Sequence, residues 1–323
     1  MNQQFRVAQK IGLMFRPGAA IPDDIKTWAI SQLQSNSPAL GISRISSKVE
    51  TWPQSLQPDL DERAKLFRLL QGTFLKNREI KIEKQRQVKD HQNMIKHSMI
   101  KKDELKFAHR NVYGKDQIRL RLMSFWSNHF TIGDVFMNEA LIGHAMEEAI
   151  LANLNGSFSD MLYKVTTHPG MLTYLDNNNS AGEDSKHYSW CKRQVDCQAG
   201  LDDNLGRELL ELHTVSPKAG YSETDIRQTA KVLAGWGAFF DQSIKDLKEW
   251  NGTSNHWDMF KTHFAEPGNK TVMGKAIGVG KGGLRQLTDH LASNEYTIMH
   301  ISEKLCQHFV SDNPQKKDID FIA

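Results

Sequence analysis

The sequence predicts an all-α, mostly helical protein: a multi-helix orthogonal bundle with long loops and at most one small β-hairpin. Three observations predict this class. Apolar residues recur at helical spacing in many segments, and residues typical of helix starts and stops border those segments. The chain of 323 residues contains only nine prolines, so long helices are permitted. A single short apolar stretch around a Pro-Gly turn is typical of a hairpin.

The first part of the chain is expected to contain two helical pieces within residues 8–33, separated by Arg16-Pro17-Gly18. Residues 35–58 carry three prolines and are expected to form a connection. Residues 61–107 have a helical pattern that is charged and rich in lysine. Within them, residues 76–106 alternate in charge, which favours a solvated helix or helix pair over a surface that binds an acidic partner, and no interleaved aromatic side chains support nucleic-acid stacking.

The middle of the chain has the clearest helical patterns. Residues 115–130 place their apolar side chains and His129 on one side of a helix. Residues 138–154 predict a second amphipathic helix, which ends near Asn155-Gly156, a good C-terminal stop. Thr167-His168-Pro169 opens a further helix, because proline suits the first helical position.

A long polar loop is predicted at residues 177–203, directly after Asp176. A loop of this length inside a compact domain is usually functional or mobile. It leads into a predicted helix at residues 204–214. Ser222, with Asp225 three residues later, resembles a capping box and predicts the start of the next helix.

Residues 253–283 are predicted to be irregular, with one small hairpin. Its turn is expected at Pro267-Gly268-Asn269, flanked by Met259-Phe260 and by residues 271–273. The glycines within residues 278–283 do not have the spacing of a dinucleotide-binding loop, so a flexible turn is predicted there.

The last part of the chain predicts a helix pair at residues 284–310. Residues 318–323 look like the opening of another amphipathic element, and no stop signal follows them. We therefore expect residues 1–323 to form a single helical domain that is C-terminally incomplete. One domain is favoured over two because the candidate polar face described below draws on His129 and Glu208, which lie far apart in the sequence.

Composition argues against several classes of protein. The formal net charge of +3 is too small to indicate a nucleic-acid partner. No stretch approaches the roughly 18 apolar residues of a transmembrane segment, and no signal peptide is visible, so the chain as written is expected in the cytoplasm. The three cysteines, Cys191, Cys197 and Cys306, are few, odd in number and contain no C-x-x-C pair. We therefore expect free thiols, and neither a disulfide framework nor a thiolate zinc site.

The predicted helix at residues 204–214 carries the sharpest candidate site. At 100° per residue, one face of this helix presents two carboxylates, an amide and a guanidinium, from Asn204, Arg207, Glu208 and Glu211, while His213 borders the leucine face. One interpretation is a solvated stripe with a weak i, i+4 ion pair. The other is a buried stripe whose two carboxylates bind a metal or share one proton.

His129 is the second candidate, because it projects from an apolar helix face among aromatic residues, with Asn128 beside that face. Such a histidine either packs in the core or lines a pocket. Burial would lower its pKa and favour the neutral imidazole, which is the form needed by a metal ligand or a general base.

Five motifs occur in a specific order along the chain: Phe125-Trp-x-Asn-His-Phe130; His168-Pro-x-Met-Leu-x-x-Leu-Asp-Asn177; Asn204-x-x-Arg-Glu-Leu-Leu-Glu-Leu-His-Thr214; Gly220-Tyr-x-x-x-Asp225 with Ala234-Gly-Trp236; and Lys304-Leu-Cys-x-His-Phe-Val310. Together they resemble the bacterial family catalogued as domain of unknown function 1800, from about residue 8 onward. The resemblance implies a longer protein, in a family whose members are often exported and lie beside a sulfatase-like companion. It implies no particular reaction.

The chain departs from the family pattern in three places. The motif that opens Asn-x-Asn in the family has Asp202 in its first position here. Gly206 replaces an alanine, which should weaken the helix by about 0.5–1 kcal/mol. The family hairpin carries His-Asp before Pro-Gly-x-Lys, whereas Ala265-Glu266 precede this motif here and Lys270 ends it. If the missing histidine is functional, this chain is altered there, and His263 lies two residues earlier.

Two functional hypotheses follow. In the first, the protein is a hydrolase in which His129 and Glu208 hold a divalent metal or act as an acid–base pair, aided by Glu211, and Arg207 steers an anionic group. Binding contributions are then expected from Asn128, Asn204, His213, Asp176 and Lys270. In the second, the stripe is a structural network in a non-catalytic, envelope-associated accessory protein, with the sulfatase-like protein as its companion.

Overall fold

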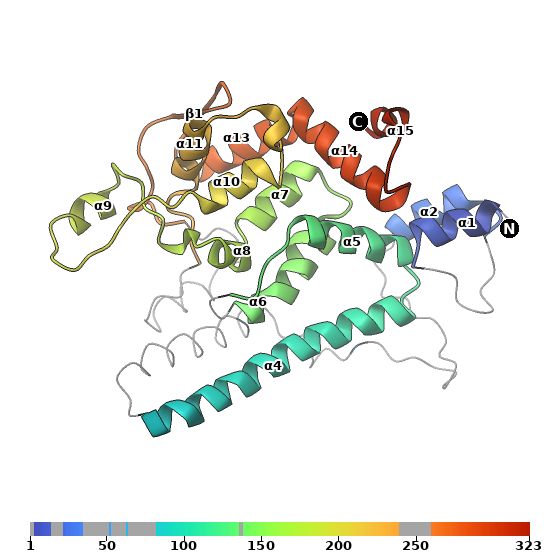
Figure 1. The fold of residues 1–323 in the computed structure, drawn as a ribbon, viewed down its shortest axis with the longest axis horizontal. Coiled ribbons are helices and arrows are strands. Elements are labelled where there is room, and N and C mark those ends of the chain that lie inside the picture. The colour runs from blue at the N-terminus through green and yellow to red at the C-terminus, as the bar shows by residue number, and fades with distance from the viewer. Residues whose placement is uncertain are drawn as a thin grey trace.

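The computed structural model describes residues 3–13, 22–34, 52, 63, 82–135, 138–238 and 260–323. The all-α prediction is confirmed, because helices make up most of this part of the chain (Figure 1). Its one sheet is a hairpin of two short strands. The prediction of a single domain over residues 1–323 stays a prediction.

Two N-terminal helices are present, α1 (Gln3–Ile11) and α2 (Ile25–Gln34), and the first begins five residues before the predicted range of 8–33. The second helix docks on α5 (Gln117–His129) through buried polar contacts. The Gln32 side chain accepts a hydrogen bond from the Ile118 amide at 3.0 Å. The guanidinium of Arg119 donates to the carbonyls of Leu33 and Leu151. The connection predicted at residues 35–58 lies almost entirely outside the described residues.

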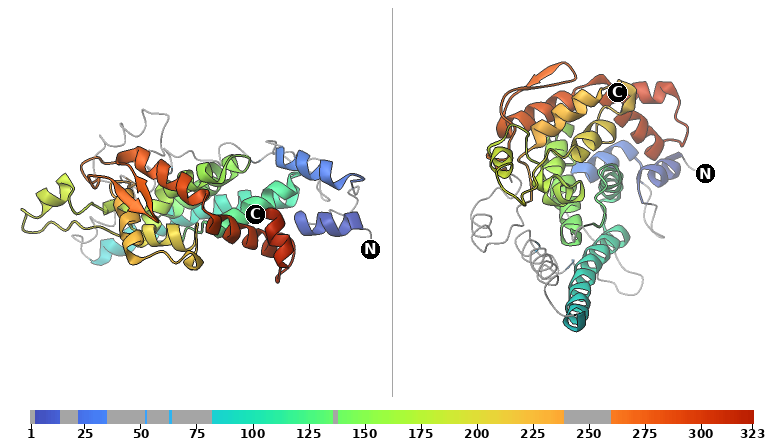
Figure 2. Two further views of the ribbon diagram at one scale, coloured as in Figure 1. Left: turned by 90° about the horizontal axis from the view of Figure 1, so that it is seen from above. Right: turned by 60° about the vertical axis from the view of Figure 1, so that its left-hand side comes forward.

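A long charged helix, α4 (Ile82–Tyr113), runs along one edge of the molecule, set apart from most of the other helices (Figures 1 and 2). It confirms the prediction of a charged helix over residues 82–107, while residues 64–81 lie outside the described part. Next in the chain after α5 comes α6 (Glu139–His144), which continues as a π-helical turn and a 3-10 turn to Asn153. The predicted helix at residues 138–154 therefore has the expected ends but is not a uniform α-helix.

The helix α7 (Phe158–Thr166) was not predicted, although Ser157 caps it by accepting a hydrogen bond from the Asp160 amide. The predicted helix start at Pro169 is confirmed in α8 (Pro169–Tyr174). Its N-cap residue is His168, whose Nδ1 accepts a hydrogen bond from the Gly170 amide. The histidine imidazole thus takes the capping role that a serine or aspartate usually fills.

The long polar loop contains a 3-10 turn (Asn177–Asn179) and the short helix α9 (Lys186–Cys191). The loop that carries α9 extends to one end of the molecule, opposite α1 (Figure 2). It leads into α10 (Asn204–Glu211), which is shorter than predicted. After a 3-10 turn (Pro217–Ala219), the predicted capping box of Ser222 and Asp225 opens α11 (Glu223–Leu233).

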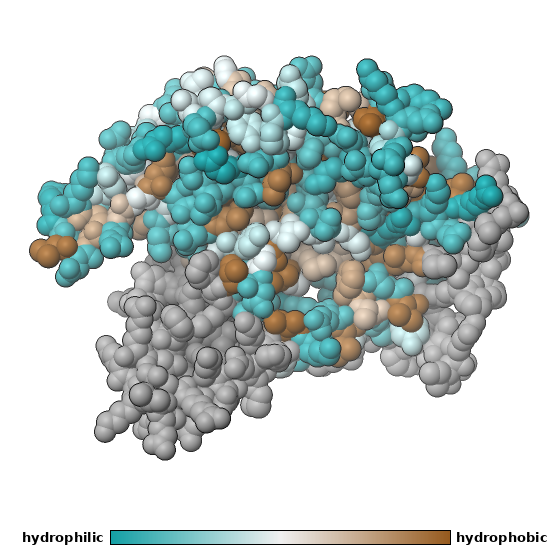
Figure 3. Space-filling view, in the orientation of Figure 1, coloured by the Kyte–Doolittle hydropathy of each residue, from teal (hydrophilic) through white to brown (hydrophobic). Residues whose placement is uncertain are grey.

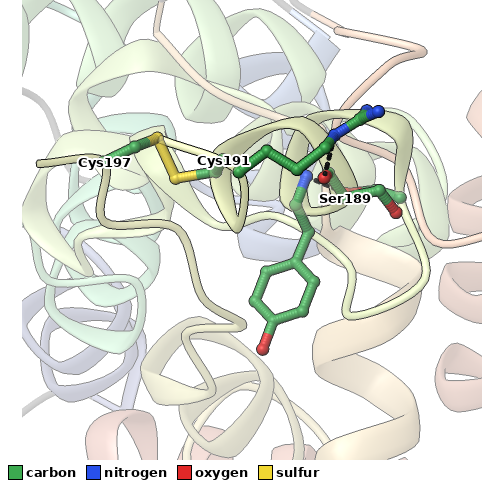
Figure 4. Close-up of a disulfide and its surroundings, with 6 residues drawn as sticks. Ser189, Cys191 and Cys197 are labelled. Atoms are coloured by element: carbon green, nitrogen blue, oxygen red, sulfur yellow. Dashed lines mark hydrogen bonds between the residues drawn. A yellow bond between two sulfur atoms is a disulfide. The ribbon is translucent and has the colours of Figure 1, made fainter. Parts of the chain in front are cut away.

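The prediction of three free thiols is wrong for Cys191 and Cys197, which form a disulfide between the end of α9 and the following loop (Figure 4). Their Cα atoms are 5.2 Å apart, within the range that a disulfide needs. An odd total of cysteines argues against a framework of disulfides, but it cannot exclude one local pair. Cys306 is a free, buried thiol, as expected.

The predicted hairpin exists, but its position was wrong. The strands are β1 (Lys270–Val272) and β2 (Lys275–Ile277), and Lys270 pairs with Ile277. The turn falls at Met273-Gly274, where both residues have positive φ, because a two-residue turn of this kind matches the twist of the strands. The Pro267-Gly268 turn predicted at its centre lies before the first strand.

The predicted flexible turn at residues 278–283 is also wrong in part, because α13 (Gly280–Ala292) begins there. A Cβ atom on Gly283 would collide with the Gly278 carbonyl, so the glycines allow a close approach of backbone to helix. The predicted helix pair is completed by α14 (Glu295–Phe309), and α15 (Lys316–Ile322) follows it.

The hydrophobic core lies between the helices that follow α4 in the chain. Its largest fully buried side chains come from α5, α7, α8, α10 and the segment after α11, and include Phe130, Leu162, Leu172, Leu209 and Trp236. The described residues on the face seen in Figure 3 are mostly polar. Among the helices that are described, none is long and apolar enough to cross a membrane.

Candidate functional site

Three segments far apart in the chain converge at the C-terminal end of α5. Four side chains meet there: His129 from α5, His213 from the segment after α10, and His300 and Lys304 from α14. We call these four residues the histidine–lysine cluster. The ring centroid of His129 lies 6.2 Å from that of His213 and 6.3 Å from that of His300. The cluster thus contains two of the residues predicted from sequence and two that were not predicted.

Aromatic side chains hold His129 in place. Its ring is stacked on Phe125 and meets Trp126 and Phe130 edge-on, and the side chain is only 4% exposed. Phe125 and Trp126 lie on the same helix face as His129, as the helical spacing predicts. The surroundings of this imidazole are therefore apolar on several sides.

Hydrogen bonds define which ring nitrogen of His129 carries the proton. The Lys304 Nζ atom lies 2.8 Å from His129 Nδ1. Because an ammonium group only donates, Nδ1 accepts this bond. The other nitrogen, Nε2, lies 3.1 Å from the His213 carbonyl oxygen and donates to it. His129 is thus held as a neutral imidazole with its proton on Nε2.

The electrostatics of the cluster favour uncharged side chains. Burial, followed by the charge of Lys304, holds the pKa of His129 well below its usual value of 6.5. The same two causes lower the pKa of His213 to about 4. Burial also lowers the pKa of Lys304 and of His300. An amine of lowered pKa therefore faces an imidazole that is neutral at pH 7.

The carboxylates of α10 form a separate group. Glu208 and Glu211 are half-buried, and burial together with the charge of Glu211 raises the pKa of Glu208. The Tyr221 hydroxyl donates to Glu211 at 3.5 Å. No hydrogen bond or ion pair joins these carboxylates to His129, so the predicted acid–base pair of His129 and Glu208 is not brought together by contact.

Arg207 is engaged at the surface. Both of its terminal nitrogens donate to the exposed carboxylate of Glu223, at 3.0 and 3.1 Å, and Asp203 lies 3.6 Å away. This bidentate pair already places a carboxylate against the charge of the guanidinium, which weakens its attraction for an anionic substrate. This side of α10 therefore matches the interpretation of a solvated stripe better than that of a buried constellation.

The other predicted binding residues lie apart from the cluster. Asn128, Asn204 and Asp176 are exposed, and Asp176 has a left-handed backbone with φ of 55°. Lys270 is buried, and its ammonium donates to the carbonyls of Glu266 and Gly268 in the turn before β1. The structure thus assigns Lys270 a local structural role, in a hairpin remote from His129 in the sequence.

The predicted metal ligands were His129 and Glu208. His129 has no lone pair directed at open space, because Nδ1 accepts from Lys304 and Nε2 carries a proton. Zinc needs the lone pair of a neutral imidazole nitrogen. The residues therefore do not fit a metal at this place in the state described, and the metal stays a prediction from the sequence.

A cavity of about 300 Å³ lies elsewhere, between α4 and the segment formed by α6 and its π-helical turn. Its apolar lining includes Phe107, Met123 and Met146, and carboxylates such as Glu147 lie at its wall. Glu147 is already in ion-pair distance of Lys106 and Arg110. None of the site residues predicted from sequence lines this cavity.

Sequence reasoning missed Lys304 and His300 as site residues. Two signals were present: Lys304 opens the last of the five motifs, and His300, Lys304 and His308 follow one another at i, i+4 spacing on a single helix face. That face of α14 meets the apolar face of α5, where ring contacts join Phe125 to His308 and Phe309.

A family model described as "Protein of unknown function (DUF1800)" matches residues 11–323. Comparison with curated proteins and with solved structures gives no match.

Proposed function

Because the chain belongs to the DUF1800 family, whose description names no activity, we propose a function from the site itself: acid–base hydrolysis in which Lys304 and His129 handle the proton. One observation carries this proposal. The amine of Lys304, half-buried and of lowered pKa, lies 2.8 Å from a buried neutral imidazole. Catalytic bases are often tuned in this way, by burial that brings a lysine pKa toward neutrality.

The chemical step needs only groups that are present in the cluster. The neutral Lys304 amine takes a proton from a water molecule as the water oxygen attacks the electrophilic atom of the scissile bond. One O–H bond breaks, an N–H bond and a bond from the oxygen to that atom form, and the bond to the leaving group then breaks. His129 Nδ1 then accepts a hydrogen bond from the new ammonium and stabilises it. The ammonium returns the proton to the leaving group, which restores the amine.

His300 offers a second proton carrier in the cluster. Its Nε2 is buried and has no hydrogen-bond partner within the described part of the chain. The pKa of His300 is lowered by burial first and then by Lys304, so the imidazole is available in its neutral form.

The test is a panel of chromogenic ester, amide, phosphoester and glycoside substrates, assayed between pH 5 and 10. We expect hydrolysis of one class, with a rate that rises with pH as the amine loses its proton. Lys304→Met should lower the rate by roughly 10²–10⁴-fold, which is the usual contribution of a general base. Lys304→Arg should be equally inactive, because an arginine keeps its proton. Lys101→Met, at an exposed position on α4, is the matched control.

A second candidate function is favoured by the complete hydrogen bonding of His129. Both ring nitrogens of His129 have hydrogen-bond partners, and aromatic side chains enclose its ring. The cluster therefore resembles a structural network that fixes α5 against α14. The protein would then be a non-catalytic accessory protein of the cell envelope. In that case Lys304→Met lowers the free energy of unfolding, no substrate of the panel is hydrolysed, and the expected sulfatase-like companion co-purifies with the full chain.

A further inference from the structure

A group of potential metal ligands lies far from the histidine–lysine cluster, in the loop that carries α9. Among the residues that the structure describes, one set of three or more His, Cys, Asp or Glu side chains has ligand atoms close enough to share an ion: His187, Cys191 and Cys197. Their ligand atoms all lie within 4.8 Å of one another. The two sulfur atoms are joined in the disulfide shown in Figure 4.

We propose that reduction of the Cys191–Cys197 disulfide converts this corner into a binding site for a soft divalent cation of the Zn²⁺ type, held by two thiolates and the imidazole of His187. Thiolate and imidazole together are a ligand set that zinc prefers. The disulfide and the metal exclude each other, because the thiolates that bind the ion form only when the S–S bond has been reduced.

His187 is positioned for this role by its helix and its neighbours. It precedes Cys191 by four residues on α9, so both side chains lie on one face of the helix. The imidazole ring lies flat on Phe264, with ring centroids 3.7 Å apart, and the His187 amide donates to the His263 carbonyl at 2.8 Å. Stacking fixes one ring face and leaves the ring edge, which carries the nitrogens, to point elsewhere.

A ring nitrogen of His187 lies close to the sulfur atoms, because the ligand atoms of all three residues are within 4.8 Å of one another. No ring nitrogen of His187 has a hydrogen bond among the described residues.

The cysteines need to move little to accept an ion. With bonds of about 2.3 Å, two sulfur atoms on a tetrahedral zinc lie about 3.8 Å apart. The Cα atoms of Cys191 and Cys197 are 5.2 Å apart, a spacing that rotation about the Cα–Cβ bonds can adapt to this separation. Three protein ligands leave the fourth position of the ion for water, in a loop that is largely exposed.

Reduction of the Cys191–Cys197 disulfide is balanced in atoms and electrons when a dithiol acts as the reductant. Two thiol groups of the reductant become a disulfide, while the Cys191–Cys197 bond becomes two thiols. Binding of Zn²⁺ then displaces two protons, one from each thiol. The protein can therefore bind the metal at this site in a reducing compartment and cannot bind it in an oxidising one.

The test uses the full chain carrying Cys306→Ser, so that the only thiols come from this pair. The protein is reduced with a phosphine, which is then removed without air, and is titrated with Co²⁺ and Zn²⁺. We expect one ion per chain, a thiolate-to-cobalt charge-transfer band that Zn²⁺ abolishes, and no binding before reduction. His187→Ala should weaken binding by more than about tenfold, because loss of even an outer partner costs 10–100-fold. His290→Ala, at a histidine outside the site, should leave the affinity unchanged.

Several results would overturn the proposal: no cobalt band after reduction, equal binding before and after it, or the same affinity in His187→Ala as in the parent. The first two comparisons involve no change at the site, so they do not depend on how well a ligand variant folds. The hydrolase proposal involves none of these residues, and its failure would leave this result untouched.

Discussion

The buried His213 should make the protein lose stability between pH 6.5 and pH 4. Burial and the charge of Lys304 lower its pKa from 6.5 to about 4 in the folded chain. In this range the unfolded chain binds a proton at His213 and the folded chain does not, so acid favours unfolding. The stability that the neutral His213 contributes is fully present above pH 6.5 and is lost as the pH falls through the pKa of His213 in the folded chain, about 4.

The magnitude follows from the two pKa values. Each tenfold change in proton affinity corresponds to about 1.4 kcal/mol, so a fall from 6.5 to about 4 amounts to about 3 kcal/mol below pH 4. Near pH 5 about 2 kcal/mol of this is already lost. His129 and His168 are buried with lowered pKa values too and add to the slope in the same direction.

Comparing the parent with a His213 variant isolates the contribution of His213 to the pH dependence of the free energy of unfolding. Urea unfolding followed by tryptophan fluorescence gives the free energy of unfolding at several values between pH 7.5 and 4.5 for the parent and for His213→Gln. We expect the variant to be less stable at pH 7.5 and to lose about 2 kcal/mol less than the parent on acidification to about pH 5. Leu212→Gln, at the exposed neighbouring position, should keep the slope of the parent. Parallel curves for His213→Gln and the parent would refute the reasoning.

Three further predictions concern stability and are tested by the same urea unfolding at pH 7.5. Ser222→Ala should cost about 1 kcal/mol, because it breaks the capping box with Asp225, and Ser222→Thr, which keeps the hydroxyl, should lose much less. Gly206→Ala should not stabilise α10 despite the better helix propensity of alanine, because its Cβ would lie 3.0 Å from the Ala230 backbone nitrogen; a gain near 1 kcal/mol would contradict this. Lys270→Met should cost about 2 kcal/mol, since two turn carbonyls lose a charged donor, whereas unchanged stability would show that water replaces it.

The fold class and most helix ends could be predicted because they depend on local signals. Proline after His168, the Ser222–Asp225 capping box and the spacing of Phe125 with His129 each involve residues within one or two helical turns. The hairpin position depended on which of two glycine turns the strands use, and only tertiary contacts decide between them. The π-helical turn after α6 has no such local signal.

The candidate site was harder to predict, because its geometry depends on which helix packs against α5. Periodicity placed His129 on an apolar face but could not show that Lys304 from α14 would meet its Nδ1. The wheel of α10 grouped Arg207 with Glu208 and Glu211 correctly as neighbours. It could not show that Glu223 of α11 would bind Arg207, which makes this face a surface stripe.

The hydrogen bond between His129 and Lys304 joins residues 175 positions apart. At 5–20 residues per second, a ribosome makes α14 roughly 10–30 s after α5. During that interval the aromatic face around His129 has no partner from α14, and the imidazole has no amine beside it. The site therefore arises last in the life of the nascent chain, and a chain that stops before α14 would expose an apolar surface instead of a completed cluster.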